Sequence, residues 1–182
     1  MSSNVQNVIV RDAEEWEADM IAEVMVEAYG QYALTMPPDR WEEYRESIKA
    51  SVYGSAPVAR LIALTEGNIV GSVQMFHSSE SAYGKPEMGI HSPIIRLLAV
   101  SPAARGLGIA TLLIQEAARR SIQLGASTLN LHTSDMMASA VKLYERLGFK
   151  RAFDTDIWNG DTLVKGYRIE AASLLGERLH FS

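Results

Sequence analysis

Residues 99–110 read AVSPAARGLGIA. An apolar run ends at a proline, and Gly106 and Gly108 then stand at the start of a long amphipathic pattern. Glycine weakens a helix, so its placement here needs a reason. One interpretation is a loop that only turns. The other is a backbone that approaches an anion closely, at the positive end of a helix dipole, with Arg105 adding a charge.

The composition predicts one compact domain over residues 1–182, with a core at about 8–170. The chain has 182 residues, 47% of them hydrophobic, and a formal net charge of −5. That acidic balance argues against nucleic acid as a partner, because nucleic-acid-binding proteins normally carry a basic face. The N-terminal residues show no basic leader, and no apolar run is long enough to cross a bilayer. We therefore expect a cytoplasmic protein with no membrane partner.

The chain contains no cysteine. Disulfides, thiolate metal ligands and a cysteine nucleophile are therefore excluded. We expect no metal.

Hydrophobic periodicity predicts strands that alternate with helices around one mixed sheet. The expected strands are 8–10, the two strands of a hairpin within 59–76 that turns at Gly67 and Asn68, 94–100, 127–133, 149–153 and 162–170. The expected helices run from about 13 to 29 and over 39–52, 108–125 and 139–148. The polar, glycine-rich residues 77–93 predict a long surface loop.

Two helices have expected caps and faces. Asp12, with Glu15 three residues later, is expected to cap the first helix as a capping box. The expected buried stripe of that helix comprises Trp16, Met20, Ile21, Val24, Met25 and Ala28. The third helix is expected to bury Leu107, Thr111, Ile114, Ala118 and Ile122.

Two classes of phosphate-binding turn do not fit the glycine pair. A dinucleotide-binding fold requires GxGxxG, but Thr111 stands where the third glycine belongs. A nucleoside-triphosphate loop requires GK followed by Ser or Thr, which the sequence lacks.

The turn instead resembles a signature of the GNAT superfamily of N-acetyltransferases. RGLGIA, residues 105–110, matches the Q/RxxGxG/A pattern, follows a strand ending in LAV and opens the third helix. Residues 139–149, SAVKLYERLGF, are similar to the family's second motif, a helix that carries a tyrosine and ends in LGF. The two motifs lie at the family's usual separation, and the order of elements agrees from Val8 to Glu170. The resemblance implies an α/β fold with a mixed, mostly antiparallel central sheet flanked by helices.

The resemblance also implies acetyl-CoA as the acyl donor and no metal. The implied cofactor-binding residues are Leu98, Ala99 and Val100, whose backbone pairs with the pantetheine arm, and Arg105, Gly106, Leu107, Gly108, Ile109 and Ala110, whose N–H groups hold the pyrophosphate. An N–H near Leu98 would face the thioester oxygen. Tyr144 matches the family's general acid, although its helical spacing with Ala140, Leu143 and Leu147 also fits a core tyrosine. With no cysteine, direct attack by a primary amine in a ternary complex is the simpler course.

The proton acceptor is unassigned. Many members of the family carry a glutamate in the strand before the turn, but Ile94 occupies that position here. Candidates are Glu87, His91 and His132, and water is an alternative. Met137 stands where many relatives have a cofactor-contacting asparagine, for which Ser134 or Ser139 could substitute.

The acceptor is expected to be a small-molecule or peptide amine, and a homodimer stays open. The region that shapes the acceptor pocket in the family holds Tyr29, Tyr32, Met36, Trp41 and Tyr44, which equally fit helix packing. Two other functions stay open. The missing glutamate keeps a catalytically inactive acyl-CoA-binding or sensor module in view, and the glycine turn alone would allow a different nucleotide-binding protein.

Overall fold

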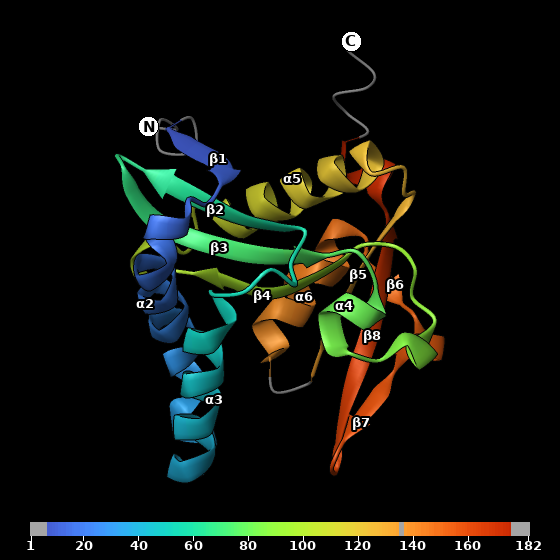
Figure 1. The fold of residues 1–182 in the computed structure, drawn as a ribbon, viewed down its shortest axis with the longest axis horizontal. Coiled ribbons are helices and arrows are strands. Elements are labelled where there is room, and N and C mark those ends of the chain that lie inside the picture. Colours follow the sequence, from blue (N-terminus) through green and yellow to red (C-terminus); the bar gives the residue numbers. More distant parts are fainter. Residues whose placement is uncertain (1–6, 135–136, 176–182) are drawn as a thin grey trace. The chain divides into compact units, whose positions relative to one another are not determined.

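The computed structural model describes residues 7–134 and 137–175 (Figure 1). The hydrogen-bonded strand order is β1-β2-β3-β4-β5-β8-β6, and β7 pairs with β8. β1–β2, β5–β8, β6–β8 and β7–β8 are antiparallel pairs, whereas β4–β5 is parallel. The predicted α/β fold, a mixed and mostly antiparallel sheet flanked by helices, is confirmed.

The chain divides into two compact units. Unit 1 comprises Met1–Gln74 and Leu97–Ile114, and unit 2 comprises Met75–Arg96 and Gln115–Ser182. β3, β4 and α5 therefore contribute residues to both units. The single domain expected over 1–182 reaches beyond the described residues and stays a prediction.

The elements follow one another in the predicted order, with short additional turns. The first half comprises β1 (Val8–Asp12), η1 (Glu15–Glu17), α2 (Ala18–Tyr29), η2 (Gly30–Thr35), α3 (Pro38–Ser51), β2 (Ala59–Thr65) and β3 (Asn68–Phe76). The middle comprises α4 (Ser79–Tyr83), η3 (Pro86–Met88), β4 (Ile94–Val100), η4 (Pro102–Ala104) and α5 (Ile109–Gln123). The last part comprises β5 (Thr128–Thr133), α6 (Ala138–Leu147), β6 (Lys150–Arg151), η6 (Phe153–Thr155), β7 (Ile157–Asn159), β8 (Thr162–Glu170) and η7 (Ala171–Leu175).

The expected cap of the first helix is wrong. Asp12 is the last residue of β1, where it pairs with Leu61 of β2, so it is not available to start a helix. The capping box lies two residues later, where the N–H of Glu14 donates to the Glu17 carboxylate at 2.8 Å. Trp16 is consequently 72% exposed instead of buried. Met20 is also exposed, whereas Ile21, Met25 and Ala28 are buried as expected.

The hairpin between β2 and β3 turns one residue earlier than expected. Its two central residues are Glu66 and Gly67, with φ of 51° and 80°. Positive φ at both central residues is the geometry of a two-residue turn that matches the twist of the flanking strands. Asn68 already belongs to β3.

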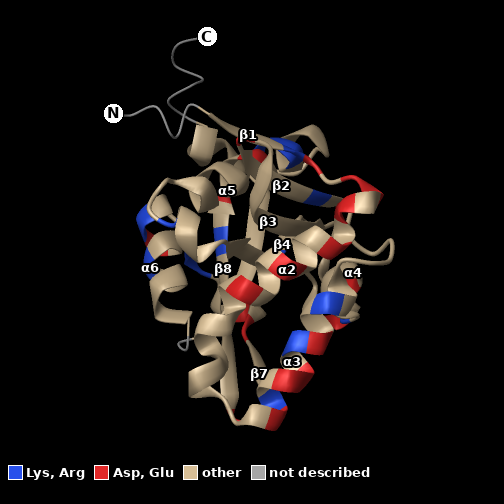
Figure 2. Ribbon diagram, turned by 90° about the vertical axis from the view of Figure 1, so that its left-hand side faces the viewer, with Lys and Arg blue, Asp and Glu red and all other residues tan. Residues whose placement is uncertain are grey.

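Helix α3 is rich in charged residues and buries little apolar surface. Figure 2 shows acidic and basic residues alternating along it, among them the ion pairs Arg45–Glu42 and Lys49–Glu46. Within the helix only Ile48 is fully buried. The expected apolar side is present, but Trp41 and Tyr44 are only partly buried.

The buried face of α5 differs from the expected one. The buried residues are Ile109, Leu113, Ile114, Ala117, Ala118 and Ser121, whereas Ile122 is 42% exposed. The stripe is shifted because Ile109 and Leu113 pack against β3 at Gly71. Ile114 and Ala118 were placed correctly.

The long surface loop that the composition predicts over residues 77–93 contains two short helical elements. These elements are α4 and η3, with Ser78 and Ser81 making the capping box of α4. Ala82 and Ile90 are buried with Phe76 and Ile94 in a small apolar cluster, against which Tyr83 packs. Few apolar residues suffice because they come together from both ends of the segment.

Residues 149–159 form shorter elements than predicted. The expected strand 149–153 is reduced to Lys150–Arg151, and residues 153–155 form the turn η6 instead. β7 was not expected. The strand over 162–170 is confirmed as β8.

Candidate functional site

The glycine turn of unit 1 connects β4 to α5. The N–H of Ser101 donates to the carbonyl of Val70 at 2.8 Å, which fixes the end of β4 to β3. After η4, Gly106 and Gly108 adopt φ of 86° and 77°. An L-residue with a side chain is strained at such angles, so the backbone requires glycine at both positions.

The space beside both glycines is open. A Cβ built on Gly106 or Gly108 would meet no atom within 4 Å. The first helical hydrogen bond runs from the N–H of Leu112 to the carbonyl of Gly108 at 3.1 Å. The N–H groups of Ile109, Ala110 and Thr111 therefore belong to the first turn, which has no acceptors within its own helix. Open approach and first-turn donors at the positive helix end fit an anionic ligand such as a pyrophosphate.

Gly71 of β3 sets where α5 begins, and sequence reasoning missed it. A Cβ at this position would lie 3.0 Å from Ile109 Cγ2, 3.1 Å from the carbonyl oxygen of Ala99 and 3.2 Å from Leu113 Cδ1. The bare backbone thus lets the first turn of α5 pack directly on β3 beside β4. An isolated glycine within a strand pattern was the available signal for such an approach.

The C-terminal end of α2 holds the turn through side chains. The guanidinium of Arg105 donates to the carbonyl of Ala28 at 3.2 Å and to Gln31 Oε1 at 3.4 Å. A cation at a helix C-terminus also interacts favourably with the dipole. The hydroxyl of Ser101 donates to the carboxylate of Glu27 at 3.0 Å. Arg105 therefore joins the turn to α2, in addition to carrying the positive charge noted in the sequence.

Strand β4 carries an unusual backbone angle before its expected cofactor-binding end. Leu97 has φ of 57°, the left-handed conformation that a bulky residue rarely adopts. The next carbonyl, that of Leu98, accepts a hydrogen bond from the hydroxyl of Tyr29 at 2.8 Å. Strained backbone of this kind persists only where the surrounding structure enforces it.

The aromatic residues expected near an acceptor pocket come together in part. Tyr29 lies in an edge contact with Tyr44, ring centroids 5.9 Å apart, and 6.1 Å from the ring of Tyr32. Trp41 contacts Tyr44 at 6.2 Å. Burial raises the pKa of Tyr32, and the charge of Arg105 opposes that rise. The cluster thus reaches both Leu98 and Arg105 of the same unit. Met36 is partly buried.

Tyr144 belongs to unit 2, where it lies near the end of α6. It is 7% exposed, and its ring makes an edge contact with Phe149 at 5.8 Å. The N–H of Phe149 donates to the carbonyl of Tyr144 at 3.0 Å, after Gly148 ends the helix in the left-handed conformation. The second motif is therefore one local packing unit.

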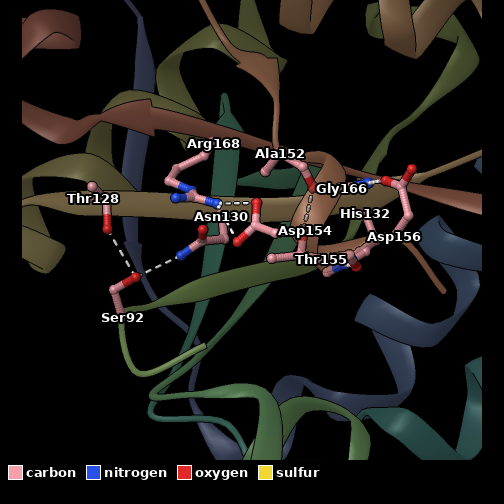
Figure 3. A network of polar contacts seen from close by, with 10 residues as sticks. All are labelled: Ser92, Thr128, Asn130, His132, Ala152, Asp154, Thr155, Asp156, Gly166 and Arg168. Carbon is pink, nitrogen blue, oxygen red and sulfur yellow. Dashed lines mark hydrogen bonds and ion pairs between the residues drawn. The ribbon is translucent and has the colours of Figure 1, made fainter. Parts of the chain in front are cut away.

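Among the three candidate bases, His132 alone is engaged in a partly buried polar network (Figure 3). Glu87 and His91 are exposed. His132 Nε2 lies 2.8 Å from the carbonyl oxygen of Thr155, and Nδ1 lies 3.0 Å from the hydroxyl of Tyr83. Burial lowers the pKa of His132, so the imidazole is neutral at pH 7.

Figure 3 also shows a second set of contacts on β5, at Asn130. The amide of Asn130 and the hydroxyl of Thr128 both donate to Ser92 Oγ, at 2.7 and 2.8 Å. These hydrogen bonds tie the loop before β4 to β5. Ile94, at the position where a glutamate was sought, is fully buried and packs in the apolar cluster.

Within residues 7–134 and 137–175, no three His, Asp or Glu side chains come together as potential metal ligands. None of the helices in these ranges is both long enough and apolar enough to span a bilayer.

Met137, which stands where many relatives have a cofactor-contacting asparagine, is partly buried. Of the two serines considered as substitutes for that asparagine, Ser134 is partly buried and Ser139 is exposed.

The strand, glycine turn and helix have the arrangement expected of an acyltransferase. Comparison of the chain with known protein families gives the same class. The model of the Acetyltransferase (GNAT) family matches residues 19–149. That range covers most of the chain and includes both motifs. The chain belongs to the GNAT acetyltransferase family.

Individual relatives are more distant. An uncharacterized N-acetyltransferase of Schizosaccharomyces pombe is 41% identical over 56 residues, which is 31% of this chain and 34% of that relative. The match thus spans about a third of the relative's length.

Solved structures show the same fold. PaiA N-acetyltransferase from Thermoplasma acidophilum, in complex with coenzyme A, superimposes with a TM-score of 0.67 at 14% identity, over 89% of this chain and 99% of that one. YncA from Salmonella typhimurium, with its cofactor acetyl-CoA, gives a TM-score of 0.59 at 15% identity, over 91% and 94% of the two chains.

Proposed function

We propose that this chain is an N-acetyltransferase that moves an acetyl group from acetyl-CoA to a primary amine. One observation carries the proposal: Gly106 and Gly108 hold positive φ beside open space, directly before the first turn of α5. Such a turn accepts a pyrophosphate without steric obstruction and with aligned N–H donors. The family and the acetyl-CoA or coenzyme A in the two solved structures support the same donor.

The residues proposed to bind acyl-CoA are those expected from the family resemblance. Arg105 through Ala110 would bind the pyrophosphate through N–H groups, and Leu98 to Val100 would pair with the extended pantetheine arm. An N–H near Leu98 would face the thioester oxygen, where negative charge develops during attack. The left-handed Leu97 supports this assignment, because it turns the strand just before that position.

The chemistry requires a neutral amine and a protonated leaving group. An alkyl ammonium has a pKa of about 10.4, so only a small fraction is nucleophilic near pH 7. We assign Tyr144 as the acid that protonates the departing thiolate. Since the chain has no cysteine, direct attack in a ternary complex avoids the covalent thiol intermediate.

The acceptor class is a small-molecule or peptide amine. Support comes from the tyrosine cluster in unit 1, in which Tyr29 bonds to the carbonyl of Leu98 and the charge of Arg105 acts on Tyr32. The net charge of −5 would favour the approach of a cationic amine over that of an anionic one.

One alternative is favoured by a specific observation. Ile94 replaces the glutamate that many members of the family carry, and it is fully buried. A catalytically inactive acyl-CoA-binding module would need no base at this position.

Two measurements test the proposal. Saturating acetyl-CoA should raise the melting temperature, since a ligand at about 100 times its Kd adds about 2.7 kcal/mol of stability. Turnover of acetyl-CoA with a panel of amines should release free coenzyme A. Binding without turnover would favour the inactive module, and stabilisation by ATP or NAD but not by acetyl-CoA would overturn the donor assignment.

A further inference from the structure

A cavity in unit 2 lies against β6 and β8, and no step of the proposed acetyl transfer uses it. Its volume of about 630 Å³ is within the range of small-molecule binding sites. Some of its lining comes from the start of β5, the end of α6 and η7. Its charged lining residues are the cationic Lys150, Arg151 and Arg168 and the anionic Asp154 and Glu170.

Two of the cations occupy directly opposite positions on antiparallel strands. Lys150 of β6 is registered with Arg168 of β8, so the two side chains leave the sheet on the same face. Like charges directly opposite each other on a sheet are destabilising. An anion bound on this face would therefore relieve the repulsion between Lys150 and Arg168.

A carboxylate of the chain itself already meets one of these cations. Both carboxylate oxygens of Asp154 accept from Arg168 Nη2, at 3.0 and 3.3 Å (Figure 3). The Arg168 side chain is 40% exposed and that of Asp154 is 74% exposed, so water screens the pair and it contributes little to stability. Asp154 thus acts as an internal stand-in for a carboxylate ligand, and it is weakly held.

Gly166 explains why Asp154 lies beside Arg168. A Cβ at Gly166 would overlap Thr155 Oγ1 and lie 2.9 Å from the carbonyl oxygen of Ala152. The N–H of Ala152 donates to the carbonyl of Gly166 at 2.8 Å, and η6 follows directly. The bare backbone of β8 therefore lets η6 lie close over the strand. These contacts fix the backbone of η6, whereas the exposed side chain of Asp154 can turn away.

Other donors of the cavity lack an acceptor. Lys150 is exposed and forms no ion pair with any residue of 7–134 and 137–175. Arg151 donates through Nη2 to Asp156 at 2.6 Å, but its Nη1 is buried and has no hydrogen-bond partner in the same ranges. A buried charged donor without an acceptor is costly. A ligand that brings acceptor oxygens would satisfy donors that the chain leaves unpaired.

The charges of the lining favour a carboxylate over a phosphate. The contact with Asp154 shows that the guanidinium of Arg168 accommodates a carboxylate here. Glu170, exposed at the end of β8, lines the same cavity, and its charge opposes a second negative charge on the bound group. A phosphate monoester carries nearly two negative charges at pH 7, whereas a carboxylate carries one.

We propose that this cavity binds small molecules that carry a carboxylate, held between Lys150 and Arg168. The carboxylate accepts from the ammonium and the guanidinium, and Asp154 gives way to it. Such charge-assisted hydrogen bonds are roughly twice as strong as neutral ones. The inference does not depend on the acetyl transfer, because these residues belong neither to the segment proposed for acyl-CoA nor to the assigned acid.

Titration of the full chain with benzoate, followed by nuclear magnetic resonance at constant ionic strength, tests the site. Benzoate should shift the backbone amide signals of residues 148–152 and 168–170 and reach saturation, whereas benzamide, which has the same ring and no charge, should not. Lys150→Gln and Arg168→Gln should each raise the Kd by about tenfold, because each removes a charge-assisted hydrogen bond. Asp154→Asn should lower the Kd several-fold, because it removes the competing carboxylate.

Lys142→Gln is the matched control. It removes an exposed lysine of α6 that does not line the cavity, so it should bind benzoate as the wild type does. Lys150 and Asp154 are also exposed, and their variants should keep the wild-type melting temperature. A changed Kd in these variants then reports the site and not the fold.

Three results would overturn the inference or a part of it. Absence of a saturable benzoate shift, or equal Kd values in Lys150→Gln and Lys142→Gln, would remove the site. Tighter binding of inorganic phosphate than of benzoate would overturn the carboxylate assignment, and unchanged or weaker binding in Asp154→Asn would overturn the displacement of Asp154. The titration contains neither acetyl-CoA nor an amine, so its failure would leave the acetyltransferase proposal standing.

Discussion

The hydroxyl of Tyr29 donates a hydrogen bond to the carbonyl oxygen of Leu98 at 2.8 Å, joining residues 69 positions apart. Tyr29 ends α2 and is buried, and Leu98 follows the left-handed Leu97 in β4. One side chain from the first helix thus fixes the strand segment proposed to bind acyl-CoA. The same end of α2 also accepts the guanidinium of Arg105.

Tyr29→Phe should therefore affect donor binding more than chemistry. Loss of one neutral hydrogen bond should lower the free energy of unfolding by about 1 kcal/mol. The KM for acetyl-CoA should rise several-fold with a smaller change in kcat, because the Leu98 carbonyl is no longer fixed. Steady-state kinetics would show this split. Tyr53→Phe, which removes an exposed hydroxyl contact, is the control, and an unchanged KM in Tyr29→Phe would show that the contact is structural only.

Gly108→Val should weaken acetyl-CoA binding by more than about tenfold, since it places a side chain in the open space before α5. The positive φ also predicts a stability cost of about 1–2 kcal/mol. Gly160 has φ of 63° and equally open surroundings, so Gly160→Val should show a similar stability cost with no loss of affinity. Calorimetric titration of both variants separates the two effects. Equal Kd values would make Gly108 a turn residue alone.

Gly71→Ala should move the start of α5. The added methyl group would press on Ile109, Leu113 and the carbonyl oxygen of Ala99, and such overpacking typically costs about 1–3 kcal/mol. Affinity for acetyl-CoA should fall as well, because the first turn of the helix is displaced. Gly30→Ala, at a glycine with open surroundings and negative φ, should be nearly neutral. Denaturation curves and acetyl-CoA titrations would measure both effects. Equal stability and equal affinity in Gly71→Ala and Gly30→Ala would contradict the role given to Gly71.

Tyr144→Phe should lower kcat by about 10²-fold while leaving the Kd for acetyl-CoA nearly intact. The phenylalanine ring can keep the edge contact with Phe149, so the melting temperature should change little. Phe149→Leu is the complementary variant, expected to lower stability more than kcat. Full activity of Tyr144→Phe would assign that tyrosine to the core.

The buried Glu17 should make stability depend on acidic pH. Its hydrogen bond and ion pair with Arg11 lower the pKa of Glu17, against the effect of burial, and the N–H of Glu14 lowers it further. Because the folded pKa is below the unfolded one, this contribution is present above the unfolded pKa and is lost as pH falls through the folded pKa.

Arg11→Met should therefore raise the pH at which acid unfolding begins. The matched variant Arg45→Met breaks an exposed pair with Glu42 and should leave the acid transition in place. Melting temperatures between about pH 3 and 7 would measure both. Coincident acid transitions in wild type and Arg11→Met would contradict the role given to this pair.

Elements whose signals are local could be recognised from the amino-acid sequence. The glycine turn, the start of α5 after it, and α6 with its left-handed Gly148 all rest on residues within one or two helical turns of each other. Glycine spacing, helix stops and periodicity are properties of short segments, so they can be recognised without the fold.

Local signals were also the source of the errors. Asp12 satisfies a capping pattern, but pairing with Leu61 in the sheet keeps it in β1. Residues 77–93 look like a loop because their few apolar side chains are scattered, and burial of Ala82 and Ile90 against Phe76 and Ile94 is what orders them.

Which polar groups contact one another depends on how the elements pack in three dimensions. Tyr29 reaches Leu98, Gly71 admits Ile109, and Tyr83 and Thr155 fix the proton position on His132. Each contact joins residues far apart in the chain, and each depends on side-chain direction and close approach between elements. Periodicity assigns residues to faces, but hydrogen-bond direction and steric fit arise only once those faces pack, which is why the candidate proton acceptor could be named from the sequence yet not given a partner.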